Sequence, residues 1–157
     1  MYRVRFATIR NLQSAMTTPS ILDAIPHRPP FLLVDEIVER DEQRIVCRKT
    51  FTGDEFWFAG HYPDYPLTPG VILCEAAMQA GAILLAQQTD GIDGVPVATR
   101  MNDVRFKKMV RPGDTIQLDV AITDRVSNAY YLTGKVTVDG QLAVRLNFAC
   151  TMAPTEK

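Results

Sequence analysis

The spacing of apolar and polar positions predicts β-strands over most of the second half of the chain. Four runs alternate β-branched or aromatic residues with polar ones and are separated by short turn sequences. These runs are residues 95–106, 115–125, 129–138 and 141–152. Between the last two lies Asp139-Gly140, a strong hairpin signal because both residue types tolerate left-handed backbone angles. The pattern therefore predicts a meander of antiparallel strands.

The first half of the chain is less regular. Two further strands are predicted at 31–39 and 44–51, and short helical segments at 20–25 and 54–59. Residues 60–68 contain prolines at 63 and 66, with a third at 69. Because each proline fixes φ and removes a backbone donor, this segment is predicted to be a stiff, irregular loop.

One segment, 69–88, has the length and composition of a long helix. It is apolar nearly all round, as expected of a helix that is enclosed by other elements. One helix with five or six antiparallel strands favours an α+β architecture, in which a curved sheet wraps round the helix.

Length and composition are those of one ordinary globular domain. The chain has 157 residues, of which 46% are hydrophobic and 22% charged, typical of a single folded domain. We expect this domain to span 19–153 and residues 1–18 to form an N-terminal extension. The formal net charge of −1 argues against nucleic-acid binding, which requires a basic surface.

The cysteines and the apolar stretches favour a cytoplasmic protein. Cys47, Cys74 and Cys150 are odd in number and lack CxxC spacing, so we expect buried, reduced thiols. The most apolar stretch, 71–86, contains Glu75 and is shorter than the roughly 20 residues of a membrane span. We therefore expect no membrane span.

Glu75 carries the strongest indication of chemistry. It is the only charged side chain between Val71 and Thr89, and an unpaired buried carboxylate is costly unless it is hydrogen-bonded or protonated. A carboxyl that is kept partly protonated suits general acid catalysis. Gln79, one helical turn later, is placed to orient it. A structural glutamate that reaches solvent or an interfacial ion pair fits the same pattern, so both interpretations stay open.

His61 is the second candidate. It lies in the proline-rich loop, where a stiff backbone would present its ring at a defined angle. Histidine is the side chain best suited to proton transfer near neutral pH. A lone loop histidine is more often an ordinary surface residue, so its candidacy depends on the other two features.

The start of the helix is the third candidate feature. Thr68 suits the N-cap and Pro69 the first helical position. The first free backbone donors would then belong to Gly70 and Val71. Those donors, together with the helix dipole, could polarise a thioester carbonyl. Ordinary helix capping, with glycine chosen for packing, is the alternative.

Together, the three features suit dehydration of a 3-hydroxyacyl thioester, which needs a base, an acid and a polarised carbonyl. Glu75 lies five residues after Gly70, about 7.5 Å along the helix axis. The acid need not face the loop of its own chain, so the pair can form across a dimer interface. Two histidines without a cysteine or carboxylate cluster argue against zinc, and no nucleophile elbow, phosphate-binding loop or dinucleotide motif occurs.

Three sequence blocks resemble one known family, the hotdog-fold 3-hydroxyacyl-acyl-carrier-protein dehydratases of fatty acid synthesis. The resemblance covers about residues 21–152. The blocks are Ile25-Pro-His-Arg-Pro-Pro-Phe-Leu-Leu-Val-Asp35, the segment from Gly60-His-Tyr-Pro to Glu75-Ala-Ala-Met-Gln79, and Arg105-Phe-Lys-Lys-Met-Val-Arg-Pro-Gly-Asp114.

This resemblance implies a hotdog fold, with His61 and Glu75 as the catalytic pair and the Gly70 amide on the thioester carbonyl. From their positions on the helix, we also expect substrate-binding roles for Val71, as the second free amide donor, and for Gln79, which would orient Glu75. Glutamate rather than aspartate on the helix favours dehydration without isomerisation. Acyl carrier protein would deliver the substrate on its phosphopantetheine arm, without a metal or other cofactor. Homodimers would share their active sites around an apolar acyl tunnel, and often assemble as trimers of dimers.

The chain also departs from the family pattern. Asp64 stands where glycine is usual and Pro29 where an aromatic residue is common, which leaves chain-length preference and carrier docking open. Lys107, Lys108 and Arg111 could meet an acidic carrier or could simply be solvated. Structural hydrogen bonds would explain the motif residues His27 and Asp35 as well as a site would.

Three other activities stay open from the sequence. The same fold supports acyl-thioesterases, in which a helix carboxylate activates water, and acyl-binding proteins without catalysis. A coenzyme A-linked enoyl hydratase is the third.

Overall fold

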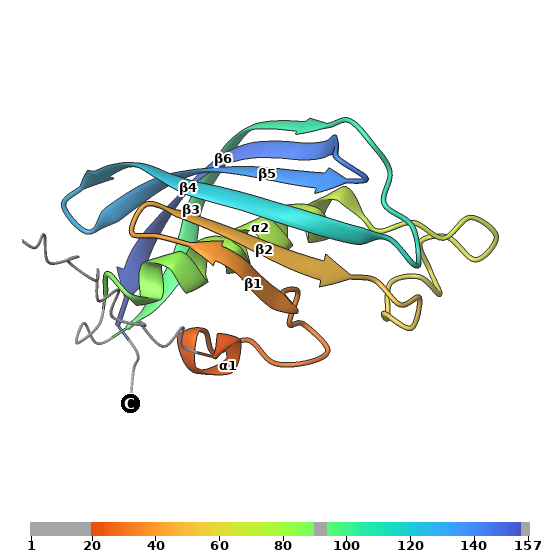
Figure 1. Ribbon diagram of the computed structural model, residues 1–157, viewed down its shortest axis with the longest axis horizontal. Helices are drawn as coiled ribbons and strands as arrows, with labels where there is room; N and C mark the ends of the chain where they lie inside the picture. The colour runs from red at the N-terminus through yellow and green to blue at the C-terminus, as the bar shows by residue number, and fades with distance from the viewer. Residues whose placement is uncertain (1–19, 90–93, 155–157) are drawn as a thin grey trace, which may run out of the picture.

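The computed structural model describes residues 20–89 and 94–154 (Figure 1). The expected N-terminal extension lies outside this range. Two helices and six strands follow one another along the chain: α1 (Ile21–Ala24), β1 (Glu36–Arg40), β2 (Arg44–Thr50), α2 (Gly70–Ala86), β3 (Val95–Phe106), β4 (Thr115–Val126), β5 (Ala129–Val138) and β6 (Gln141–Ala153).

All six strands form one antiparallel sheet in the order β1-β2-β4-β5-β6-β3. The sheet curves over α2, which lies against its inner face (Figure 1). The Asp139-Gly140 hairpin between β5 and β6 is confirmed, because φ is 51° at Asp139 and 71° at Gly140. This is the architecture predicted from the apolar pattern.

Small residues on α2 allow the sheet to approach the helix closely. Ala76, Ala77 and Ala80 are fully buried. A Cβ atom on Gly81 would come within 2.8 Å of the Phe148 ring on β6, so a larger side chain there would push the helix from the sheet. The helix is thus held by packing on several sides, and its position relative to the strands is fixed.

The two edges of the sheet differ in length and character. β1 has only five residues, including Glu36, Glu39 and Arg40, and short, charged strands are typical of edges that stay unpaired. β3 has twelve residues and exposes Val97, Met101 and Phe106. Within the described residues, its second edge has no strand partner.

Two predictions of local structure were wrong. The strand predicted at 31–39 begins only at Glu36, because the backbone of Phe31 and Leu33 bonds to a side chain of α2 instead of a neighbouring strand. The short helix predicted at 54–59 is a series of turns, with bonds from the Phe58 amide to the Glu55 carbonyl and from the His61 amide to the Trp57 carbonyl. In the described part of the chain, no helix is long and apolar enough to cross a membrane.

Candidate active site

The loop 60–68 fixes the orientation of the His61 ring. The loop extends from the end of the molecule where α2 begins (Figure 1). The Leu67 amide donates to the His61 carbonyl at 3.0 Å, and His61 Nδ1 lies 3.0 Å from the Leu67 carbonyl oxygen. Because a carbonyl oxygen only accepts, Nδ1 carries the proton in this contact. The neutral ring therefore has its lone pair on Nε2, which suits a general base.

Neighbouring segments hold this loop in place. The Thr68 amide donates to the Val110 carbonyl at 2.7 Å. On the outer side, Arg111 donates to the Tyr65 hydroxyl, and its guanidinium lies 4.3 Å from the centre of the Tyr65 ring. The connection between β3 and β4 therefore supports the loop that carries His61.

Helix α2 begins one residue later than its sequence predicted. Pro69, not Thr68, is the N-cap, and no side chain caps the helix. The Pro69 carbonyl accepts from the amides of Ile72 at 2.9 Å and Leu73 at 3.4 Å. Within the described residues, the amides of Gly70 and Val71 have no backbone partner, as expected for the first turn of a helix. The two predicted donors are thus free at the positive end of the helix dipole.

Those donors and His61 line one cavity of about 670 Å³. We call it the base cavity; its walls comprise His61, Leu67, Thr68, Pro69, Gly70, Val71, Leu73, Phe106, Lys107, Lys108 and Met109. A Cβ atom on Gly70 would lie 2.5 Å from Phe106 Cε1, so the glycine is required for this ring to pack over the helix start. The cavity combines the His61 ring with two free backbone donors, but Glu75 is not among its residues.

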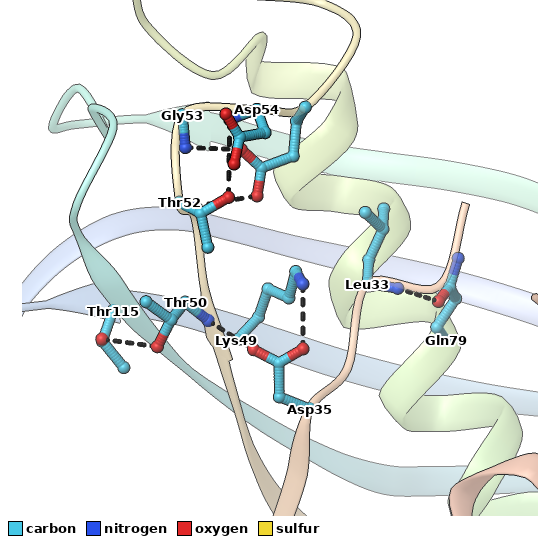
Figure 2. Close-up of polar contacts among 10 residues, drawn as sticks. Leu33, Asp35, Lys49, Thr50, Thr52, Gly53, Asp54, Gln79 and Thr115 are labelled. Carbon is cyan, nitrogen blue, oxygen red and sulfur yellow. Dashed lines mark hydrogen bonds and ion pairs between the residues drawn. The ribbon is translucent and has the colours of Figure 1, made fainter. Parts of the chain in front are cut away.

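Glu75 is held by Gln79, as the spacing of four residues predicted. Gln79 Nε2 donates to Glu75 Oε1 at 3.0 Å and to the Phe31 carbonyl at 2.9 Å. Its Oε1 accepts from the Leu33 amide at 2.8 Å (Figure 2). Gln79 is only 1% exposed, and these bonds link the segment before β1 to the helix.

A second cavity, of about 110 Å³, surrounds the Glu75 carboxyl. We call it the acid cavity; it is lined by His27, Glu75, Met78, Gln79, Ala82, Pro96, Ala98 and Cys150. Burial, with the Glu75 charge as a second cause, raises the pKa of the Cys150 thiol to about 11, which leaves it a neutral neighbour at pH 7. Burial also raises the pKa of Cys47 to about 12 and that of Cys74, in keeping with the expected structural thiols.

His27, for which the sequence left a structural role and a site role open, lines this cavity. Its Nε2 lies 3.6 Å from Glu75 Oε1. The two residues are separated by 48 positions, so no local spacing relates them. Asp35, the other motif residue, instead accepts from Lys49 Nζ at 2.9 Å and the Thr50 amide at 2.8 Å (Figure 2). Its role in this chain is therefore structural.

The structure does not bring His61 and Glu75 together within one protomer. The two cavities have no residue in common. Among the described residues, the polar contacts of Glu75 are with Gln79 and His27, whereas His61 bonds to Leu67. Each protomer thus carries the two halves of a possible site at different points along α2. No three His, Cys, Asp or Glu side chains of the described segments are arranged to hold a metal ion.

Comparisons with known proteins relate the chain to one family. The model of the FabA-like domain matches residues 25–147. A Clostridium perfringens protein named 3-hydroxyacyl-acyl-carrier-protein dehydratase FabZ is 42% identical over 128 residues, covering 82% of this chain and 92% of the relative. The chain belongs to the FabZ dehydratase family. A family member from Staphylococcus carnosus is 44% identical over 124 residues, covering 78% of this chain and 86% of the relative.

Solved structures of more distant proteins share the fold. A chain of the dehydratase heterocomplex ApeI:P from Xenorhabdus doucetiae superimposes with a TM-score of 0.74, at 14% identity, covering 86% of this chain and 91% of that one. The Escherichia coli PaaI protein gives 0.60 at 19% identity, with 74% and 81% covered. These similarities confirm the hotdog fold that the family resemblance implied.

Proposed function

We propose that this chain removes water from (3R)-3-hydroxyacyl thioesters in fatty acid synthesis and gives trans-2-enoyl thioesters. Membership of the dehydratase family carries this conclusion, because the chain matches relatives named for that reaction over most of their length. The chemistry available in the two cavities suits it. A base and carbonyl-binding donors lie in one, and a carboxyl lies in the other.

In the proposed mechanism, His61 is the base. Its Nε2 removes a proton from C2 of the substrate, and its Nδ1–H stays bonded to the Leu67 carbonyl, which holds the ring in place as charge develops. The electron pair released at C2 is delocalised onto the thioester oxygen. The free amides of Gly70 and Val71 would stabilise the negative charge there.

Glu75 is the proposed acid. Its carboxyl gives a proton to the hydroxyl on C3 as the C3–O bond breaks, water leaves, and the C2–C3 double bond forms. The step leaves His61 protonated and Glu75 ionised, so one proton must pass from the histidine back to the carboxyl before the next turnover. Gln79 keeps the carboxyl in position throughout.

The proposal requires two protomers for each active site. It is supported by the separation of the base and acid cavities within one chain. The long β3 edge exposes Val97, Met101 and Phe106 and is suited to pairing with a second copy of itself. His61 of one protomer would then meet Glu75 of its partner. Assembly of three such dimers into a hexamer stays a prediction from the family.

We further propose that the substrate arrives on acyl carrier protein and that no cofactor is needed. Lys107 and Lys108 lie in the wall of the base cavity, where they could meet an acidic carrier. Arg111 donates a hydrogen bond to Tyr65, so it also holds the loop 60–68 in place. A cytoplasmic location is expected for such an enzyme.

The decisive experiment measures enoyl thioester formation from 3-hydroxyacyl substrates of several chain lengths, carried on acyl carrier protein or on coenzyme A. We expect the wild type to be active and His61→Ala and Glu75→Gln each to lose about 10³-fold in kcat, the contribution typical of general acid–base catalysis. Full activity in either variant would remove that residue from the mechanism. Release of free thiol without dehydration would indicate a thioesterase instead.

A further inference from the structure

The two oxygens of the Glu75 carboxyl have different surroundings. Oε1 accepts from Gln79 Nε2 at 3.0 Å and faces His27 Nε2 at 3.6 Å. Oε2 has no polar contact with any of the described residues. An oxygen that already accepts a hydrogen bond is a poorer place for the acidic proton than one without a partner. The proton that a general acid must deliver therefore belongs on Oε2.

The surroundings of the His27 ring favour one of the two positions of its proton. Nδ1 is buried without a hydrogen-bond partner, whereas Nε2 points to the carboxyl. A proton on Nδ1 would be a buried donor without an acceptor, and it would leave the lone pair of Nε2 facing a carboxyl oxygen. The neutral ring is thus favoured with its proton on Nε2. The distance of 3.6 Å exceeds that of a hydrogen bond by about 0.5 Å, which a small rotation of the ring closes.

None of the other described groups around Glu75 can be the second donor to its carboxyl. Among the described residues that line the acid cavity, Cys150 of β6 is the only ionisable side chain besides His27 and Glu75, and burial holds its thiol protonated. The walls from α2 and β3 are otherwise Met78, Gln79, Ala82, Pro96 and Ala98. Arg28, next to His27, donates to the carbonyls of Leu22, Ile25 and His27. Its guanidinium fixes the backbone of His27 and is not directed at the carboxyl.

We propose that His27 is a positioning residue for the catalytic acid. With Gln79 it holds Oε1 of Glu75, so that Oε2 carries the proton for the substrate hydroxyl. The inference rests on the proposed function and adds a second histidine to it. It also means that the two histidines of the chain are different tautomers: His61 has its proton on Nδ1 and His27 has its proton on Nε2.

The first test needs no substrate. The chain has only two histidines, so ¹⁵N NMR of the full-length protein resolves both rings, and His61→Ala assigns them. Near neutral pH or slightly above, we expect one ring in the Nδ1–H form and the other, His27, in the Nε2–H form. A His27 ring with its proton on Nδ1 overturns the inference. This result is independent of turnover, so it stands even where the wild type fails to dehydrate any substrate.

The second test separates positioning from general stability. We expect His27→Leu to lower kcat about tenfold while KM changes less than twofold, and His27→Gln, which keeps a neutral donor, to recover most of the rate. Adding His27→Leu to Glu75→Gln should leave the residual rate unchanged, because His27 acts through that carboxyl. Equal rates for the Leu variant and the wild type, equal losses in the Gln and Leu variants, or an additive loss in the double variant would each overturn the proposal. The melting temperature of each variant, measured beside that of the wild type, checks that the variants are folded.

Discussion

The two cavities along α2 are opposites in shape and chemistry. The base cavity, at the start of the helix, is large and has Phe106 and Met109 exposed in its walls. The acid cavity, about one and a half turns further along, is roughly six times smaller, from 670 and 110 Å³. The first holds a histidine, the proposed base, and free amides, and the second holds a carboxyl within a hydrogen-bond network.

The difference indicates how one helix serves two sites. The beginning of a helix supplies unpaired donors, whereas its middle has no free backbone groups and must offer side chains such as Glu75 and Gln79. Within one chain the two cavities share no residue. If two protomers met in antiparallel contact, as proposed, the start of one helix would lie beside the middle of the other.

The largest effect should come from breaking the network of the acid cavity. Gln79→Leu removes the partners of the buried Leu33 amide and the Phe31 carbonyl. Leaving the buried Leu33 amide and the part-buried Phe31 carbonyl unpaired should cost about 3 kcal/mol of the free energy of unfolding, measured by urea denaturation. The control is Gln88→Leu, which loses a single surface contact with the Glu42 carbonyl and should cost below about 0.5 kcal/mol. Equal losses in both variants would contradict a special role for Gln79.

A smaller effect should follow from closing the base cavity. Gly70→Ala places a methyl group where Phe106 Cε1 would be 2.5 Å away, so this ring, which lines the base cavity, must move. We expect kcat/KM to fall about 10- to 30-fold, the rate equivalent of roughly 1.4–2 kcal/mol. Combining it with Phe106→Val, which removes the clashing ring, should recover part of the loss. An unaltered rate in Gly70→Ala would mean that the helix start does not bind the substrate.

Mixing the two inactive variants tests whether each active site is shared between two protomers. When His61→Ala and Glu75→Gln protomers are refolded together, half of the dimers are mixed, and each mixed dimer has one intact site if the sites are shared. About a quarter of the wild-type activity should therefore return. The mixture would stay inactive if each protomer built its own complete site. Each variant refolded alone is the control.

The smallest effect is expected far from both cavities. Arg44 donates twice to Asp119, with both contacts at 2.8 Å, and these bonds lower the pKa of Asp119. A lowered carboxyl pKa adds stability above the unfolded value of about 4, and this gain is lost as the pH falls. Because the Arg44 and Asp119 side chains are 42% and 31% exposed, Asp119→Asn should cost only about 0.5 kcal/mol at pH 7.

Denaturation of both proteins at pH 7 and at pH 3 checks this prediction. The difference between wild type and Asp119→Asn should shrink at the lower pH, and kcat should be the same in both. A difference that grows on acidification would contradict the assigned sign.

Local patterns were sufficient to predict much of the fold. The four strands from Val95 onward and the turn at Asp139-Gly140 depend on alternation and on backbone angles, and their bounds agree to within a residue. The Gln79–Glu75 bond follows from helical spacing alone. In each of these cases the interacting residues are close in sequence or repeat a simple period.

What could not be predicted depends on contacts between distant segments. The first strand starts late because Gln79 binds Phe31 and Leu33, more than forty positions earlier. His27 lies in the segment before β1 and Glu75 lies on α2. The bonds of Gln79 join that segment to the helix, and His27 therefore faces Glu75. The spacing along the helix already allowed Glu75 to lie apart from the loop of its own chain, but the orientation of the His61 ring depends on its bond to Leu67, which neither residue type nor spacing specifies.

The β3 edge has a consequence for how the protein behaves on dilution. A twelve-residue strand that has no partner on one side among the described residues, and that exposes Val97, Met101 and Phe106, is a template for aggregation when it stands alone. If a second protomer covers that edge, dimerisation protects the chain as well as completing its chemistry. The melting temperature should then rise with protein concentration, and a solitary protomer would be vulnerable to misassembly before it ever met a substrate.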